Sequence, residues 1–244
     1  MIVLFTLLPL SVKLSCMKIL ALDTATIAGS IAILDDSEGL LGEVRININI
    51  AHSERLMPSV EWLLNASRIS IQDIDAFAIS IGPGSFTGLR IGLSTVKGFC
   101  YATGKPVMPV PTLDAFARTL PFCPYCICPM LDARRNEVYT GLYKWEDGIM
   151  KKIISETAVN PGDFLKEIKE KTIFLGEGAK IYEKLIKDFL HTDAVFAPAD
   201  KMSPSASTVA EIAVEKIKAG IFTDPITLTP FYIRKSEAEV RWKG

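Results

Sequence analysis

The sequence predicts an α/β protein with two lobes, the second smaller than the first. Short apolar runs typical of strands alternate with segments of helical periodicity, which is the pattern of sheets covered by helices. Each half of the 244-residue sequence shows this alternation, and no linker or low-complexity segment separates the halves. We therefore expect a first lobe over residues 17–112 and a second lobe over residues 113–244.

The first half contains five apolar runs that predict strands. These runs cover residues 18–23, 29–36, 40–47, 76–79 and 106–111, with helices expected over 52–66 and 87–104. The order βββαβα, followed by the fifth strand, resembles the ribonuclease-H-like lobe of the actin and Hsp70 superfamily. In this arrangement Asp23 ends the first strand and is expected to point into the crevice beside the later strand-to-helix turn. That crevice holds phosphate in the superfamily.

The second half shows a similar but less regular succession of strands and helices. Strands are expected over residues 127–133, 137–145, 151–159 and 172–175, and helices over 161–169, 179–190 and 205–219. The last helix has an apolar face formed by Val209, Ile212, Ala213 and Ile217, with Ser205 or Ser207 near its start. We expect this helix to pack back against the first lobe.

The most informative segment is residues 80–92, which read SIGPGSFTGLRIG and connect an expected strand to an expected helix. Its glycines break the strand with a backbone turn that a side-chain-bearing residue would resist. Ser85 or Thr87 can cap the following helix. Such a turn either binds an anion or is purely architectural. The residues of a vestigial phosphate site would be Asp23, Gly82, Gly84 and Ser85.

The turn does not match the common nucleotide or nucleophile motifs. Its spacing is G-x-G-x-x-x-G, one residue off the dinucleotide fingerprint, and it lacks the Gly-Lys-Ser/Thr ending of a Walker A loop. Ser85 also lacks the glycine two residues later that a nucleophile elbow requires. The sequence therefore predicts no catalytic residue in this segment.

Small residues gather on one face of the helix expected over 87–104. These residues are Gly88, Gly92, Thr95 and Ala102, with Gly98 nearby. Because each glycine inside a helix costs about 1 kcal/mol relative to alanine, the group suggests a compensating close contact. The contact is either with the protein's own sheet or with another molecule. In the second case the interface would consist of Leu56, Val60, Leu63, Ser67, Gly88, Gly92 and Thr95.

Charge and composition exclude several classes of protein. With 27 basic and 28 acidic residues the net charge is −1, which supplies no long-range attraction to nucleic acid or to an anionic membrane. Five cysteines do not suggest a disulfide framework. Cys123, Cys126 and Cys128 lack a fourth ligand for a structural zinc ion, so no metal site is predicted. Asp23 and Asp132 without a third ligand make a weak case for a divalent ion.

Isolated polar residues are assigned structural roles. His52 is expected to cap a helix or face solvent, and Arg90 to be solvated on an exposed helix face. The apolar stretch Met1–Cys16 is too short to span a bilayer and has no basic region before its apolar run. We expect residues 1–16 to be an extension that is disordered or arises from a misassigned start, with Met17 as the natural start.

Five blocks resemble the TsaB (YeaZ) family. The blocks are LALDTAT at 20–26, HSERLMP at 52–58, GPGSFTGLRIG at 82–92, DAR at 132–134 before EVY at 137–139, and PFYIR at 230–234. The resemblance runs from about Met17 to Trp242, and the glycine-rich block is the most specific. It implies a bacterial, cytoplasmic scaffold subunit in the synthesis of N6-threonylcarbamoyladenosine at position 37 of tRNAs that read codons beginning with A.

The resemblance also implies partners. The family pairs with its catalytic paralogue TsaD, is joined by the ATPase TsaE, forms homodimers in the absence of TsaD, and meets tRNA only through the complex. Both pairings use the first two helices of the first lobe, here residues 56–66 and 87–104. No cofactor is expected on this chain, since ATP and divalent metal belong to the partner subunits.

The comparison with the catalytic paralogue predicts that this chain is not an enzyme. TsaD holds its metal with an H-x-x-x-H motif just after the fifth strand, and here residues 111–116 read PTLDAF. Ala25 also stands where a nucleotide-binding member of the superfamily favours glycine. The alternative is an ATP-binding phosphotransferase of the actin-like superfamily, with Asp23 and residues 82–88 holding phosphate. The sequence also contains no zinc-binding motif that would indicate a metalloprotease.

Overall fold

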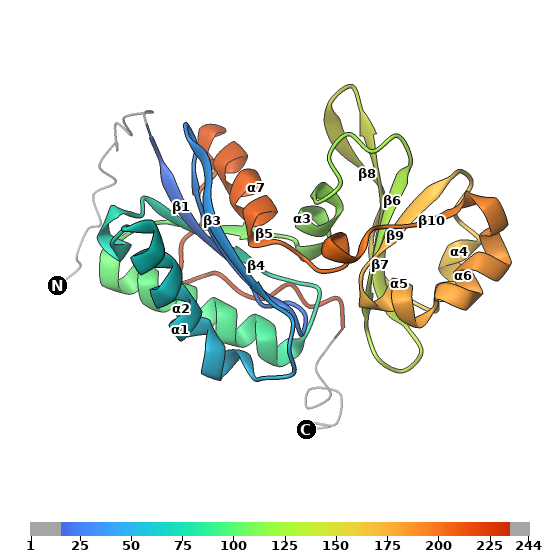
Figure 1. The fold of residues 1–244 in the computed structure, drawn as a ribbon, viewed down its shortest axis with the longest axis horizontal. Helices are drawn as coiled ribbons and strands as arrows, with labels where there is room; N and C mark the ends of the chain where they lie inside the picture. Colours follow the sequence, from blue (N-terminus) through green and yellow to red (C-terminus); the bar gives the residue numbers. More distant parts are fainter. Residues whose placement is uncertain (1–15, 235–244) are drawn as a thin grey trace.

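The structure is a computed structural model that describes residues 16–234. The extension expected over residues 1–16 therefore lies, except for Cys16, outside the described residues. Two five-stranded mixed sheets lie next to each other, each flanked by helices (Figure 1). The first sheet consists of β1 (Lys18–Asp23), β2 (Gly29–Asp35), β3 (Gly39–Ile46), β4 (Ala76–Ser80) and β5 (Val107–Val110). The second consists of β6 (Cys126–Asp132), β7 (Val138–Glu146), β8 (Ile149–Val159), β9 (Thr172–Leu175) and β10 (Ala194–Phe196).

The two sheets share one topology. Their strand orders are β3-β2-β1-β4-β5 and β8-β7-β6-β9-β10. In each sheet the first three strands form an antiparallel meander, and the last two run parallel to the first strand. This repeated topology is that of the two-lobed α/β fold expected from the sequence.

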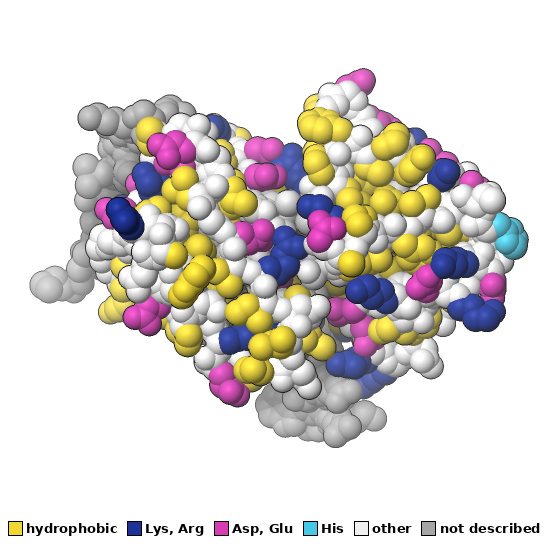
Figure 2. Space-filling model, viewed as in Figure 1, with side chains coloured by type: hydrophobic (Ala, Val, Ile, Leu, Met, Phe, Trp, Pro, Cys, Tyr) yellow, Lys and Arg dark blue, Asp and Glu magenta, His cyan; other side chains and the backbone are white. Residues whose placement is uncertain are grey.

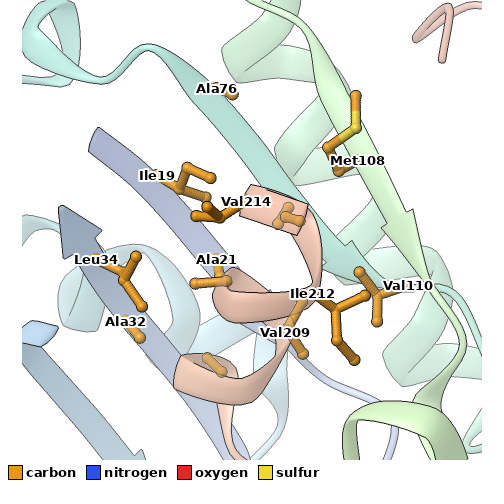
Figure 3. Packing of buried hydrophobic residues seen from close by; sticks show 14 of the residues in the cluster. Ile19, Ala21, Ala32, Leu34, Ala76, Met108, Val110, Val209, Ile212 and Val214 are labelled. Carbon is orange, nitrogen blue, oxygen red and sulfur yellow. The ribbon is translucent and has the colours of Figure 1, made fainter. Parts of the chain in front are cut away.

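Helices cover both faces of the first sheet. On one face lie α1 (His52–Ser67) and α2 (Phe86–Thr103), and on the other lies α7 (Ala206–Lys218). Ile19 and Ala21 of β1 contact the α7 side, while Leu20 and Leu22 contact the α1 and α2 side, as strand alternation requires. The last helix thus packs on the first sheet, with Val209, Ile212 and Val214 facing the strands (Figure 3).

The helices of the second sheet are short. They are α3 (Thr112–Arg118), α4 (Pro161–Leu165), α5 (Glu177–Ile181) and α6 (Glu183–Leu190), together with the 3-10 helices η2 (His191–Asp193) and η3 (Ala199–Lys201). A further 3-10 helix, η1 (Ile71–Asp73), lies between α1 and β4 of the first lobe. The buried side chains of α4, α5 and α6 form one hydrophobic cluster with the second sheet, and those of α3 belong to a different cluster. Among residues 16–234, no helix combines the length and the hydrophobicity that spanning a bilayer requires.

The sequence expectations differ from the structure at short elements. The seven-residue α3 and the three-residue β10 were not expected, because neither is long enough to show a period. The helix expected over 179–190 is two helices that meet at Tyr182, and the one expected over 161–169 ends at Leu165. Ser85 is the N-cap of α2, as expected, and accepts a hydrogen bond from the Gly88 amide.

Candidate partner-binding face and interlobe cleft

The glycine-rich turn before α2 packs tightly on the protein's own backbone. A Cβ atom at Gly84 would lie 2.4 Å from the carbonyl oxygen of Ala25, and one at Gly82 would lie 2.4 Å from that of Phe231. The Ser85 amide donates to the Ala25 carbonyl at 2.7 Å. The two glycines therefore allow three backbone segments to meet.

Asp23 does not face the crevice, contrary to the sequence expectation. Its side chain is fully buried and accepts hydrogen bonds from the Ser80 hydroxyl and, at 3.0 Å, from the Ala25 amide. Burial raises the pKa of Asp23, and these two hydrogen bonds oppose the shift. The carboxyl group thus joins β1, β4 and the loop after β1, and it has no route to a phosphate.

The glycine face of α2 is turned inward. A Cβ atom at Gly92 would lie 2.2 Å from Oγ1 of Thr24, and one at Gly88 would lie 2.1 Å from the Thr24 carbonyl oxygen. The Thr24 hydroxyl in turn donates to the Gly88 carbonyl at 2.8 Å. Of the two contacts left open by the sequence, the intramolecular one is present, so Gly88 and Gly92 do not offer an outward docking surface.

The other residues expected at an interface are also turned inward. Leu56, Val60 and Leu63 are buried in the core between α1 and the first sheet. Ser67 and Thr95 are half-buried, and the Thr95 hydroxyl donates to the Ile91 carbonyl of its own helix at 2.9 Å. The apolar stripe identified in the sequence is therefore the inward face of α1, which corrects its assignment as contact surface.

An outward face of α1 and α2 carries large exposed side chains instead. The side chain of Tyr101 is 94% exposed, that of Trp62 is 62% exposed and that of Met57 is 48% exposed. Gly98 lies on the same exposed side of α2, with no atom near the position of a Cβ. We call this surface the two-helix face, defined by Met57, Pro58, Glu61, Trp62, Ser94, Gly98, Tyr101 and Ala102.

Hydrophobic side chains gather over α1 and α2 at the lower left of the surface shown in Figure 2. Grouped exposed hydrophobic side chains often mark protein contacts, and aromatic residues are enriched at such contacts. The signal was present in the sequence, because Trp62 and Tyr101 are large apolar residues that fall outside the inward stripes of their helices. The two-helix face is therefore the candidate surface for a protein partner.

His52 is buried at the start of α1 and does not face solvent, which corrects a further expectation. Its Nε2 lies 2.7 Å from the carbonyl oxygen of Thr26, and its Nδ1 lies 3.3 Å from the Arg55 guanidinium. Burial lowers the pKa of His52, and the nearby Arg55 charge lowers it further. His52 therefore ties α1 to the loop between β1 and β2.

A cleft of about 550 Å³ lies between the two lobes. From the first lobe it is lined by Ala25, Thr26, Ile27, Gly84, Ser85 and Phe86, from the second by Leu131, Asp132, Ala133, Arg134, Arg135, Tyr139, Glu177 and Ile181, and from the last part of the described chain by Tyr232 and Arg234. Of the residues expected to hold phosphate, Gly84 and Ser85 line the cleft, whereas Asp23 and Gly82 are buried away from it.

Residues 229–234 form a strap that joins the two lobes. The Phe231 amide donates to the Ile81 carbonyl at 2.7 Å, and the ring of Tyr232 stacks on that of Phe86 with 5.1 Å between centroids. Arg234 forms an ion pair with Glu137 on the turn between β6 and β7. Because this turn belongs to the second sheet, the strap spans the boundary between the lobes.

Arg90 takes part in the anchoring of the strap. Its guanidinium carbon lies 3.8 Å from the centroid of the Phe86 ring, and its Nε donates to the Tyr232 hydroxyl at 3.1 Å. The sequence placed Arg90 on an exposed helix face, which is where it lies, but did not indicate these contacts. They depend on a segment distant in the chain.

The cysteine cluster is divided between buried and half-buried positions. Burial raises the pKa of the Cys126 thiol to about 11 and that of Cys128 to about 12, so both stay protonated at neutral pH. Cys123 is half-buried. Within residues 16–234, no three potential metal-ligating side chains are grouped as a metal ion would require.

Comparison with solved structures defines the class of fold. Component A of (R)-2-hydroxyglutaryl-CoA dehydratase from Acidaminococcus fermentans superposes with a TM-score of 0.51 at 11% identity, covering 83% of this chain and 99% of that chain. This likeness concerns the fold alone, which is the two-lobed actin-like α/β fold expected from the sequence. The structure of YeaZ from Pseudomonas aeruginosa is more similar, with a TM-score of 0.75 at 27% identity over 88% of this chain and all of that chain.

Sequence comparison identifies the family. The family model described as TsaD, tRNA N6-adenosine threonylcarbamoyltransferase, matches residues 40–242. The Bacillus subtilis protein named tRNA threonylcarbamoyladenosine biosynthesis protein TsaB is 33% identical over 93% of this chain and 98% of its own length, and the Escherichia coli protein of the same name is 29% identical over 93% and 97%. The chain belongs to the TsaB (YeaZ) family, as the resemblance indicated.

Proposed function

We propose that this chain is a non-catalytic subunit in the biosynthesis of N6-threonylcarbamoyladenosine in tRNA, and that it binds a TsaD partner through the two-helix face. TsaE joins the assembly, and a second copy of the chain occupies the same face when TsaD is absent. ATP and divalent metal are held by the partner subunits, and tRNA is contacted through the complex. The protein acts in the cytoplasm.

The observation that carries this proposal is the exposure of Tyr101 and Trp62 on adjacent helices. A tyrosine that is 94% exposed on a well-formed helix gains little from the folded monomer. It can bury a large area when a partner covers it, and aromatic residues of this kind dominate the energy of many interfaces. Gly98 and Ala102 beside it allow a partner helix to approach closely.

A second observation supports a non-catalytic role. The place where TsaD is expected to carry its metal-binding histidines corresponds here to α3, which contains no histidine. Leu113 and Phe116 of this helix are fully buried in the core of the second sheet, and Ala115 is fully buried in the core between the first sheet and α7. The segment is therefore used for packing, with apolar side chains that cannot coordinate a metal ion.

The alternative phosphotransferase loses its main candidate residue. Asp23 is enclosed by Ser80 and the Ala25 amide and reaches neither solvent nor the cleft. Asp132, the other carboxylate considered, pairs with Arg134 at 3.3 Å. Asp132 lines the interlobe cleft, but the buried Asp23 does not join it there as the second carboxylate.

The proposal is tested in a strain depleted of the native protein. We expect the double variant Trp62→Glu/Tyr101→Glu to lose co-purification with TsaD and to leave tRNA unmodified at adenosine 37. A matched control is Ile149→Glu, whose side chain is 64% exposed on the second lobe. Normal modification by the double variant at equal protein levels would contradict the proposal. A bulky residue at Gly92 would not be a suitable test of this face, because Gly92 packs inside the protein.

A further inference from the structure

A groove of about 760 Å³ lies between β3 and the first half of α1. We call it the β3–α1 groove and define it by residues 43–46 of β3 and by five residues of α1, which are Glu54, Arg55, Pro58, Ser59 and Trp62. Pro58 and Trp62 also belong to the two-helix face. The groove therefore continues that face toward the edge of the first sheet.

The strand that forms one wall of the groove is an edge strand. In the described chain β3 pairs with β2 alone, and its residues 41–46 are half-buried. On the opposite edge of the sheet, Val107 of β5 forms a bridge with Thr223, and among residues 16–234 the outer edge of β3 has no such bridge. An edge strand leaves backbone N–H and C=O groups unpaired, and an extended peptide can pair with them as an additional strand.

The side chains of β3 alternate between the two faces of the sheet. A Cβ atom at Gly42 would lie 2.9 Å from Cδ1 of Leu63 on α1. Glu43 instead accepts a hydrogen bond at 2.5 Å from the hydroxyl of Ser205, at the start of α7. A strand added beside β3 would follow the same alternation, so every second side chain would enter the groove on the α1 side.

Two different environments follow each other along the α1 side of the groove. Nη1 of Arg55 donates to the carbonyl oxygen of Ile46 at 2.9 Å, so this cation lies at the end of β3. Trp62 immediately precedes Leu63, which lies beside Gly42 nearer the start of the strand. An added strand would therefore meet a positive charge at one position and an exposed aromatic ring further along.

The charge of Arg55 has no carboxylate partner among residues 16–234. Its guanidinium donates to the carbonyl oxygens of Ile46 and Ile27 and lies 3.3 Å from Nδ1 of His52. Its Nε atom is buried and has no hydrogen-bond partner in the same part of the chain. A buried donor without an acceptor is unfavourable, and hydrogen bonds from guanidinium to carboxylate are among the strongest in proteins. The groove therefore favours a segment that brings a carboxylate.

We propose that an extended segment of the partner occupies the β3–α1 groove and pairs with β3 as a sixth strand of the first sheet. This inference rests on the proposed function, because the partner is the protein that covers the two-helix face. One side chain of the segment is a carboxylate that pairs with Arg55. The next side chain on the α1 side, two residues away, is apolar and packs on Pro58 and Trp62.

Amide hydrogen exchange of the complex with purified TsaD tests the added strand. We expect residues 41–46 to exchange at least about tenfold more slowly in the complex than in the free chain, because their outward amides gain hydrogen bonds. Residues 149–159 form β8, an edge strand of the second sheet, and their exchange should not change. The variant Tyr101→Glu, which is expected to lose TsaD, should show no protection of residues 41–46.

Opposite charges at one position of the groove test the carboxylate. Ser59 is half-buried in the groove and lies outside the two-helix face. In titration calorimetry Ser59→Glu should weaken TsaD binding at least about fivefold through repulsion of the segment's carboxylate, and Ser59→Lys should bind at least as tightly as the unmodified chain. Glu54→Gln, which removes a like charge from the groove, should strengthen binding. Ser53 is exposed on α1 outside the groove, so Ser53→Glu and Ser53→Lys should bind alike.

The outcomes separate this inference from the partner assignment. Unchanged exchange of residues 41–46 in a complex that still depends on Tyr101 would overturn the inference and leave the two-helix face intact. Equal weakening by Ser59→Glu and Ser59→Lys would also overturn it, since the segment would then respond to size and not to charge. Protection that appears in the free chain as its concentration rises would assign the groove to a second copy instead. If TsaD does not bind the unmodified chain, the proposed function and this inference fail together.

Discussion

The comparison of Gly92→Ala with Gly98→Ala tests the packing of α2 in one pair of matched substitutions. The new methyl group at Gly92 would lie 2.2 Å from Thr24 Oγ1 and 3.0 Å from Ile79 Cδ1. Thr24 is fully buried, and its hydroxyl is held by the hydrogen bond to the Gly88 carbonyl. The methyl group therefore displaces a threonine that is itself fixed.

The change in the free energy of unfolding caused by Gly92→Ala has three contributions. Overpacking a core costs about 1–3 kcal/mol, and loss of the Thr24 hydrogen bond adds about 1 kcal/mol. The higher helix propensity of alanine returns about 1 kcal/mol. We expect Gly92→Ala to lower the free energy of unfolding by about 1–3 kcal/mol, which for a chain of this size corresponds to about 2–12 °C in melting temperature.

Gly98 provides the control because nothing lies within 4 Å of its Cβ position. Gly98→Ala should change only the helix propensity, which is higher for alanine, and should raise the free energy of unfolding by up to about 1 kcal/mol. Both variants are measured by urea denaturation followed by circular dichroism. If Gly92→Ala proved as stable as Gly98→Ala, the inward orientation of the glycine face would be refuted.

Three further outcomes are expected. Because the pKa of His52 in the folded chain is below its ordinary value of 6.5, the unfolded chain binds the proton more readily. The free energy of unfolding should therefore fall as pH drops below about 6.5. His52→Gln should reduce this pH dependence in denaturation curves. Asp23→Asn should retain tRNA modification in the depleted strain, since the buried carboxyl group takes no part in chemistry; loss of modification with an intact fold would favour the phosphotransferase. Arg90→Ala should free Tyr232 and speed proteolysis between residues 226 and 234, and an unchanged cleavage rate would contradict the role of Arg90 as an anchor.

The sequence predicted most of the long elements because their periods are local. Strands such as β1 and helices such as α1 and α2 show their pattern within a few residues, and the Ser85 cap follows from its position before α2. The direction in which Gly92 faces is a different kind of fact. It depends on Thr24, which tertiary folding brings from β1, so small residues alone could not distinguish an internal contact from an external one.

Gly84 and Ser85 were expected beside a crevice and line the cleft, but its other walls could not be predicted for the same reason. Its walls come from the loop after β1, the turn after β6, the start of α5 and the strap, and no local pattern links Arg134 to Tyr232. The position of Asp23 at the end of β1 did not predict where its side chain points. The carboxyl group is held inside the protein by the hydroxyl of Ser80 on the neighbouring strand. The exposed Tyr101 was readable in principle, because it breaks the apolar pattern of its helix.

The most direct test of the central claim is the affinity of this chain for TsaD, measured by titration calorimetry with the purified proteins. Tyr101→Glu removes the most exposed side chain of the two-helix face without touching the core. If that face binds TsaD, the variant should bind at least about 30-fold more weakly, as expected for loss of an interface residue worth 2 kcal/mol or more, and Ile149→Glu should bind normally. Equal affinity of Tyr101→Glu and the unmodified chain would contradict the assignment of the two-helix face.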